Sequence, residues 1–196
     1  MIKNVTTYFQ KYAATLSQYL NSTNHELIAE LFNDLLICQE SKKQLFICGN
    51  GGSAGNAIHL ANDFLYGVKN QNNEGIRVVA LPANASVITC LANDISYERI
   101  YSEQLNTYAN KGDILIALSG SGNSKNILEA IESAKKLGVK TYAILGFDGG
   151  FAKKIVDRPI HFNVHDMQIS EDLQLIVGHI LMQMISNQHK GLSKYE

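Results

Sequence analysis

The chain has 196 residues, of which 45% are hydrophobic and 18% are charged, and its formal net charge is −1 at pH 7. This length suits one domain with a sizeable core, and the balanced charge gives no electrostatic reason to expect a nucleic acid or an anionic membrane as partner. No apolar run approaches the roughly 20 residues of a membrane span, and no signal peptide opens the chain, so we expect a cytoplasmic protein.

Two helices are predicted at the N-terminus, within residues 1–40. Apolar side chains recur there at helical spacing, and the segment 21–24 supplies capping residues between the two helices. No strand precedes these helices, so they form an extension of a single domain at 1–196 whose α/β core covers 41–190. The extension could cover the core or contact another subunit, and the sequence leaves both open.

Strands and helices alternate from residue 44 onward. Strands are predicted at 44–49, 76–81, 113–118, 140–146 and 159–164, and helices at 53–68, 84–91, 97–109, 124–137, 150–156 and 170–188. The strands are short, continuous apolar runs, so the order predicts a three-layer α/β/α sandwich around a five-stranded parallel sheet. Cys38, Cys48 and Cys90 lie in apolar runs and are expected to be small buried hydrophobes without a disulfide or metal.

Two glycine–serine turns each follow a strand and open a helix. The first is Gly-Asn-Gly-Gly-Ser at 49–53, and the second, at 118–124, contains Ser119, Ser121 and Ser124. Open α/β sheets bind ligands at such places, and a phosphate gains there from helix-terminal N–H groups and from close backbone approach at glycine. Neither turn has a nucleotide-binding fingerprint. Helix capping is the alternative for each turn, but two such turns in one sheet favour a phosphorylated small molecule.

His59 and Asp63 stand four residues apart on the helix predicted at 53–68, so they share one face. The core face of that helix is expected to consist of Ala54, Ile58, Ala61 and Leu65, with His59 and Asp63 pointing away from it. A solvated surface pair is the alternative to a functional site. The phosphate turn one helix turn away favours a site.

The last predicted helix, 170–188, is apolar on two sides. One stripe contains Leu173, Ile176, Val177, Ile180 and Met184, and a roughly opposite stripe contains Glu171, Leu175, Gly178, His179 and Met182. A helix that is apolar on both sides is buried on both sides, and the sheet covers only one of them. We therefore expect a homo-oligomer in which His179 and Glu171 lie near a subunit interface and His179 approaches His59 from a neighbouring subunit. The alternative for His179 is a buried histidine bonded to a neighbour.

Three sequence segments resemble those of the sugar isomerase (SIS) domain: Gly-Asn-Gly-Gly-Ser-Ala at 49–54, Leu-Ala-Asn-Asp at 91–94 and Ser-Gly-Ser-Gly-Asn-Ser at 119–124. Within that group the chain is similar to the phosphoheptose isomerase family over about residues 40–188. The resemblance implies a flavodoxin-like sheet, a tetramer, and an aldose–ketose isomerase. That enzyme would convert sedoheptulose 7-phosphate to D-glycero-D-manno-heptose 7-phosphate for lipopolysaccharide or capsule precursors.

The resemblance also implies roles for particular residues. Substrate and phosphate would be bound by Asn50, Gly51, Gly52, Ser53, Asn93, Asp94, Ser119, Gly120, Ser121 and Ser124. Asp63, His179 and Glu171 would carry out acid–base catalysis, and His59, Asp63, Glu171 and His179 would form a zinc-binding set. Asp63 stands where the family usually has Glu, Glu171 where it has Gln, and Gly67 where it has Arg.

The residues themselves leave two questions open. Imidazole and carboxylate groups suit both zinc binding and proton transfer between C1 and C2, so the metal and acid–base roles compete for the same side chains. The alternatives to the heptose isomerase are a non-catalytic SIS module that binds a phosphosugar or a protein partner, and an isomerase for another phosphosugar.

Overall fold

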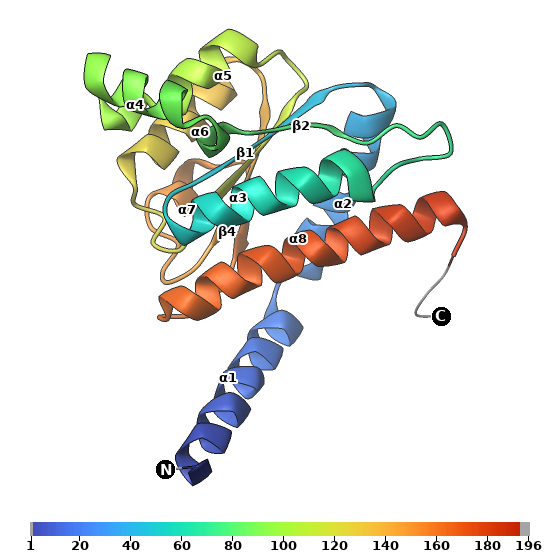
Figure 1. Cartoon of the computed structure of the whole chain (residues 1–196), viewed down its shortest axis with the longest axis vertical. Coiled ribbons are helices and arrows are strands. Elements are labelled where there is room, and N and C mark those ends of the chain that lie inside the picture. Colours follow the sequence, from blue (N-terminus) through green and yellow to red (C-terminus); the bar gives the residue numbers. More distant parts are fainter. Residues whose placement is uncertain (1, 193–196) are drawn as a thin grey trace.

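The computed structural model of the chain describes residues 2–192, and its centre is a sheet of five parallel strands (Figure 1). The strands are β1 (Gln44–Gly49), β2 (Arg77–Ala80), β3 (Ile114–Ser119), β4 (Lys140–Leu145) and β5 (Arg158–His161). They lie in the order β2-β1-β3-β4-β5, which is the flavodoxin-like order. The predicted parallel sheet is confirmed. Residue 1 and residues 193–196, which the single-domain prediction includes, lie outside the described residues.

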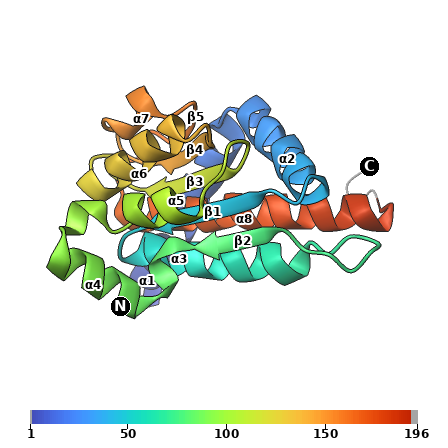
Figure 2. The same ribbon diagram turned by 90° about the horizontal axis from the view of Figure 1, so that it is seen from above.

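Helices cover both faces of the sheet. Successive strand residues point to opposite faces, and Leu45 and Ile47 lie in one buried cluster while Phe46 and Cys48 lie in the other. The first cluster is closed by α2 (His25–Glu40), α3 (Gly52–Asn62) and α8 (Met167–Lys190), and the second by α5 (Ser102–Tyr108), α6 (Lys125–Lys136) and α7 (Ala152–Ile155). Figure 2 shows the sheet between these layers. The three-layer sandwich is therefore confirmed.

Some predicted helices are divided or differently bounded. The helix expected at 53–68 becomes α3 followed by a π-helical turn, η1 (Asp63–Gly67), and the helix expected at 97–109 becomes the 3₁₀ turn η3 (Tyr97–Arg99) and α5. The remaining elements are η2 (Leu81–Ala83) and α4 (Ala85–Asp94). Helix α8 begins at Met167 because the Asp166 carboxylate accepts a hydrogen bond from the Ile169 N–H.

Helix α1 (Ile2–Ser22) extends away from the sheet, as Figure 1 shows. The Tyr12 hydroxyl donates a 2.5 Å hydrogen bond to the Asp172 carboxylate of α8. Tyr8 and Phe9 are 72% and 74% exposed. Of the two alternatives for the N-terminal helices, cover of the core therefore does not hold for the N-terminal half of α1. No helix among residues 2–192 combines the length and the apolar character that a membrane crossing requires.

The predicted core face of α3 is wrong. Ile58 and Leu65 are 46% and 56% exposed, and the side chains that α3 and η1 bury are Ser53, Ala57, Leu60 and Phe64. Apolar residues occur almost all round this helix, so their periodicity alone did not fix which side meets the sheet.

The two stripes predicted on α8 are only partly correct. Leu173 and Val177 are buried as expected, but Ile180 and Met184 are exposed, and Leu181 and Ile185 complete the core. The exposed Ile180 and Met184 lie toward α1 and α2, where they line a shallow apolar cavity with Leu20 and Ile28.

The cysteines differ among themselves. Cys38 and Cys48 are buried as expected, and burial raises the pKa of the Cys48 thiol to about 12, which keeps it protonated and inert. Cys90 is exposed on α4, contrary to the prediction, because α4 buries none of its residues.

Candidate active site

The two glycine–serine turns form one cradle at the carboxyl edge of the sheet. They follow β1 and β3, which are neighbours with Gly49 in register with Leu118. The chain reverses its direction of strand addition between these two strands, and doubly wound sheets bind their ligands at that point. A cavity of about 260 Å³ lies there, lined by Asn50, Gly51, Gly52, Ser53, Leu118, Ser119, Gly120, Ser121, Ser124, Met167 and Glu171.

Two helix N-termini open onto this cradle. Helix α3 starts after Gly51, whose φ of 55° is in the left-handed region that favours glycine, and no side chain caps it. Helix α6 starts after Ser124, whose side chain makes no capping hydrogen bond. Amide N–H groups in the first turn of a helix have no intrahelical partner, so both helices present free donors and positive dipole ends to an anion.

The hydroxyl groups of the cradle divide into two kinds. Ser119 Oγ is buried and accepts a 3.0 Å hydrogen bond from the Gly122 N–H, so it holds the second turn in shape. Ser121 Oγ accepts from the Asn123 N–H at 3.3 Å. Within residues 2–192, the hydroxyls of Ser53 and Ser124 have no hydrogen-bond partner, so they are free to donate to a ligand.

Asn50 joins the two turns. Its side-chain amide exchanges two hydrogen bonds with that of Asn126, at 2.9 and 2.8 Å, and the Tyr97 hydroxyl donates to Asn50 Oδ1 at 3.0 Å. This network fixes the start of α6 against the end of β1. The sequence analysis missed Asn126 and Tyr97. Asn126 could have been found from its place two residues after Ser124, whereas Tyr97 gave no signal.

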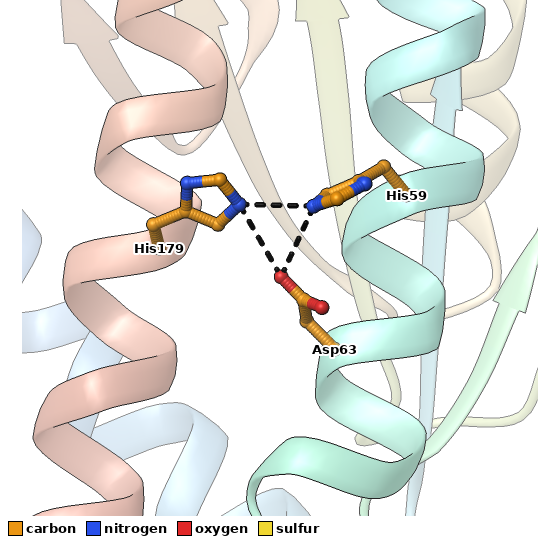
Figure 3. A group of neighbouring side chains, drawn as sticks. All are labelled: His59, Asp63 and His179. Carbon is orange, nitrogen blue, oxygen red and sulfur yellow. Dashed lines mark hydrogen bonds and ion pairs between the residues drawn. The ribbon is translucent and has the colours of Figure 1, made fainter.

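A cluster of three side chains lies between α3 and α8 (Figure 3). His59 Nε2 and His179 Nε2 are 3.0 Å apart, and each lies 3.4 Å from Asp63 Oδ2. All three residues belong to one chain, so the expectation that His179 reaches His59 from a neighbouring subunit is wrong. The two helices lie side by side in the same direction, and Asn56 links them through a 2.9 Å hydrogen bond to the Glu171 carbonyl.

The cluster has the dimensions of a metal site. The three facing atoms form a triangle with edges of 3.0 to 3.4 Å, and the ligands of a tetrahedral zinc ion at about 2.05 Å lie about 3.3 Å apart. Two imidazoles and one carboxylate are ligands that zinc accepts. The side chains of His59 and His179 are 51% and 39% exposed, so the triangle has an open side, as catalytic zinc sites have.

Glu171 lies in the cradle rather than in the cluster. A Cβ atom added to Gly52 would be 2.3 Å from Glu171 Oε2, so the carboxylate sits directly on the start of α3. Glu171 precedes His179 by eight residues, which is about 12 Å along a helix. The structure therefore brings together three of the predicted metal ligands and places the fourth where a phosphate would bind.

A second cavity, of about 570 Å³, lies at the opposite edge of the sheet, where the strands begin. Both of its carboxylates are paired with lysines: Asp34 with Lys140 at 2.8 Å and Asp157 with Lys135 at 3.0 Å. The cradle is smaller, but it combines free hydroxyls with two helix N-termini. We therefore place the candidate active site at the carboxyl edge.

Known proteins resemble this chain over most of its length. The SIS domain family model matches residues 7–146. A phosphoheptose isomerase of Nitratiruptor is 36% identical over 163 residues, which cover 82% of this chain and 87% of that protein. One of Helicobacter pylori is 36% identical over 176 residues, covering 90% and 87%. The chain belongs to the phosphoheptose isomerase family.

The fold agrees with that membership. The structure of a phosphoheptose isomerase from Neisseria gonorrhoeae matches this one with a TM-score of 0.86 at 24% identity, over 94% of this chain and 98% of that one.

Asn93 and Asp94, which the family resemblance assigns to substrate binding, do not line the cradle. They are exposed at the end of α4, where the Asn93 amide donates to Asp94 and lowers the pKa of its carboxyl. Gly67 ends η1 beside Met182.

Proposed function

We propose that the protein converts sedoheptulose 7-phosphate to D-glycero-D-manno-heptose 7-phosphate. The observation that carries this proposal is the spacing between the anion cradle and the histidine cluster. Gly52 and His59 lie on one helix, seven residues apart, which is about 10 Å along the axis. A seven-carbon sugar phosphate can span this distance, with its phosphate in the cradle and its C1 and C2 beside the histidine cluster.

Isomerisation moves a proton between C1 and C2 through an enediol. Imidazole groups exchange protons near neutral pH, and a carboxylate can accept the carbon-bound proton. Asp63 and His179 are the acid–base pair that we propose, with C1 and C2 beside them and phosphate on Ser53 and Ser124. The carboxylate of Glu171 lies beside the cradle, and because it repels a phosphate, its proposed contact is with a hydroxyl of the sugar.

As the alternative to the acid–base role, we propose that His59, Asp63 and His179 hold a zinc ion. When bound, it would stabilise the negative charge that develops on the enediolate oxygen. Glu171 stays outside this set unless its side chain turns toward the cluster. The metal and acid–base roles of Asp63 and His179 exclude each other at any one atom, and metal analysis of active protein separates them.

A homo-oligomer, specifically a tetramer, is also proposed. Tyr8, Phe9 and Tyr12 form an exposed apolar strip on α1, and Ile180 and Met184 expose a second one on α8. Strips of this kind favour burial against another copy. We propose that the enzyme acts in the cytoplasm and supplies precursors of lipopolysaccharide or capsule. Sedimentation of the purified protein measures the oligomeric state.

The decisive experiment follows the conversion of sedoheptulose 7-phosphate by purified protein, with and without added zinc, and includes a panel of other phosphosugars. We expect an aldose phosphate as product, and His179→Ala to abolish turnover while the circular dichroism spectrum stays unchanged. If the protein converts another phosphosugar and not sedoheptulose 7-phosphate, the proposed substrate is wrong and the protein is an isomerase for that other sugar. Binding of phosphosugar without conversion of any would refute the enzyme and leave a binding module.

A further inference from the structure

Helices α3 and α8 are in close contact at a glycine of α8. A Cβ atom added to Gly178 would lie 2.2 Å from Leu60 Cδ2 and 2.7 Å from Leu60 Cδ1. Gly178 precedes His179 directly, and Leu60 follows His59 directly. This close contact is therefore one residue from the cluster on both helices.

Leu60 has little freedom to move aside. Its side chain is 2% exposed and belongs to the buried cluster that also contains Ala57 and Phe64. Ordinary carbon contacts begin at 3.4 Å, so a methyl group at position 178 requires a displacement of about 1.2 Å. In a close-packed layer, much of that displacement falls on the distance between the helix axes.

We propose that Gly178 is a positioning residue, whose missing side chain sets the helix separation at which His59, Asp63 and His179 meet. The triangle has edges of 3.0 to 3.4 Å. Two of these edges join α3 or η1 to α8, so they lengthen when the helices separate. An ion that contacts all three atoms, or a proton passed between them, requires the short edges. The inference rests on the proposed function, because it takes the cluster as the reaction centre.

The test compares Gly178→Ala with a matched control, Gly55→Ala. Gly55 is also a helical glycine, on α3, and a Cβ atom added there meets no atom within 4 Å. We expect Gly178→Ala to weaken zinc binding about 10- to 100-fold, the usual effect of disturbing the support of a ligand. We expect kcat to fall at least about tenfold, with KM within about twofold because the cradle is about 10 Å away along α3. The control Gly55→Ala should match the wild type in zinc affinity, kcat and KM.

A compensating change separates positioning from general damage. Leu60→Ala removes the carbons that the new methyl group would meet, so Gly178→Ala combined with Leu60→Ala should recover zinc affinity to within about threefold of Leu60→Ala alone. Leu60→Val replaces Leu60→Ala if the larger truncation prevents folding. Zinc affinity that is unchanged in Gly178→Ala, or that stays low in the double variant, overturns the proposal.

The inference and the proposed function can fail separately. A wild-type protein that binds zinc but does not convert sedoheptulose 7-phosphate refutes the function, while the zinc titrations still test the role of Gly178. If the wild type binds no zinc, crystal structures of the wild type and of Gly178→Ala decide. The distance between His59 Nε2 and His179 Nε2 should grow by about 1 Å, and an unchanged distance overturns the proposal.

Discussion

Removing the hydroxyl of Ser124 should weaken substrate binding without affecting stability. Ser124 occupies the N-cap of α6, where a serine that caps contributes about 0.5–2 kcal/mol to stability. Its side chain makes no capping bond here, so Ser124→Ala should change the free energy of unfolding by less than about 0.5 kcal/mol. A hydrogen bond to a charged phosphate is worth about 1.5–3 kcal/mol, so KM should rise about 10- to 100-fold.

The kinetic pattern follows from where the phosphate sits. It is held equally before and during the reaction, so KM should rise while kcat stays within about twofold. Steady-state kinetics with sedoheptulose 7-phosphate and urea denaturation measure the two effects. Ser133→Ala is the matched control, because this serine lies near the other end of α6 and its hydroxyl donates to Asn106 Oδ1, away from the cradle. An unchanged KM together with a loss of stability of about 1 kcal/mol would show that Ser124 caps the helix and does not bind phosphate.

Three further predictions concern the cradle, the metal and the pH dependence of stability. Gly120→Ala would place a Cβ atom 2.6 Å from Met167 Sδ and narrow the cavity, so KM should rise more than about tenfold, and an unchanged KM would exclude close contact with substrate. A chelator should abolish turnover and lower the melting temperature, and zinc should restore both, because an ion that binds only the folded protein stabilises it; full activity in metal-free protein would contradict the zinc proposal. Burial alone would raise the pKa of Asp157, but hydrogen bonds from Thr141 and Lys135 lower it below its usual value. A lowered pKa in the folded protein means that ionised Asp157 stabilises the fold. Its contribution to the free energy of unfolding is complete above the ordinary aspartate pKa of about 4 and is lost as pH falls through the lower pKa of Asp157 in the folded protein. Urea denaturation should show the difference between wild type and Asp157→Asn shrinking over that range, and a constant difference would refute the assignment.

Much of the fold followed from local patterns. The strands are short apolar runs, and β1 and β3 end in glycine and serine, so the strand positions and the location of both turns could be predicted from neighbouring residues alone. The shared face of His59 and Asp63 is equally local, because four residues make about one helical turn. Family resemblance added the substrate and the flavodoxin-like sheet, and the parallel sheet places the two predicted turns on adjacent strands.

Other features depended on packing that no local pattern encodes. The phase of α3 was mispredicted because apolar residues surround the helix, and only contact with the sheet selects Leu60 and Phe64 as the buried side. Asn93 and Asp94 were assigned by resemblance to the substrate site, but α4 carries them to the surface, away from the cradle.

The sequence by itself determined an anion cradle at the ends of two parallel strands and a helix that presents His59 with Asp63. Only the tertiary structure decided what these groups meet. His179 is 120 residues from His59, and the two imidazoles lie 3.0 Å apart because α8 packs along α3 within the same chain. The same packing puts Glu171 against Gly52, in the cradle. Both outcomes depend on the distance and register between two helices, which side chains distant in the sequence set together and no single segment specifies.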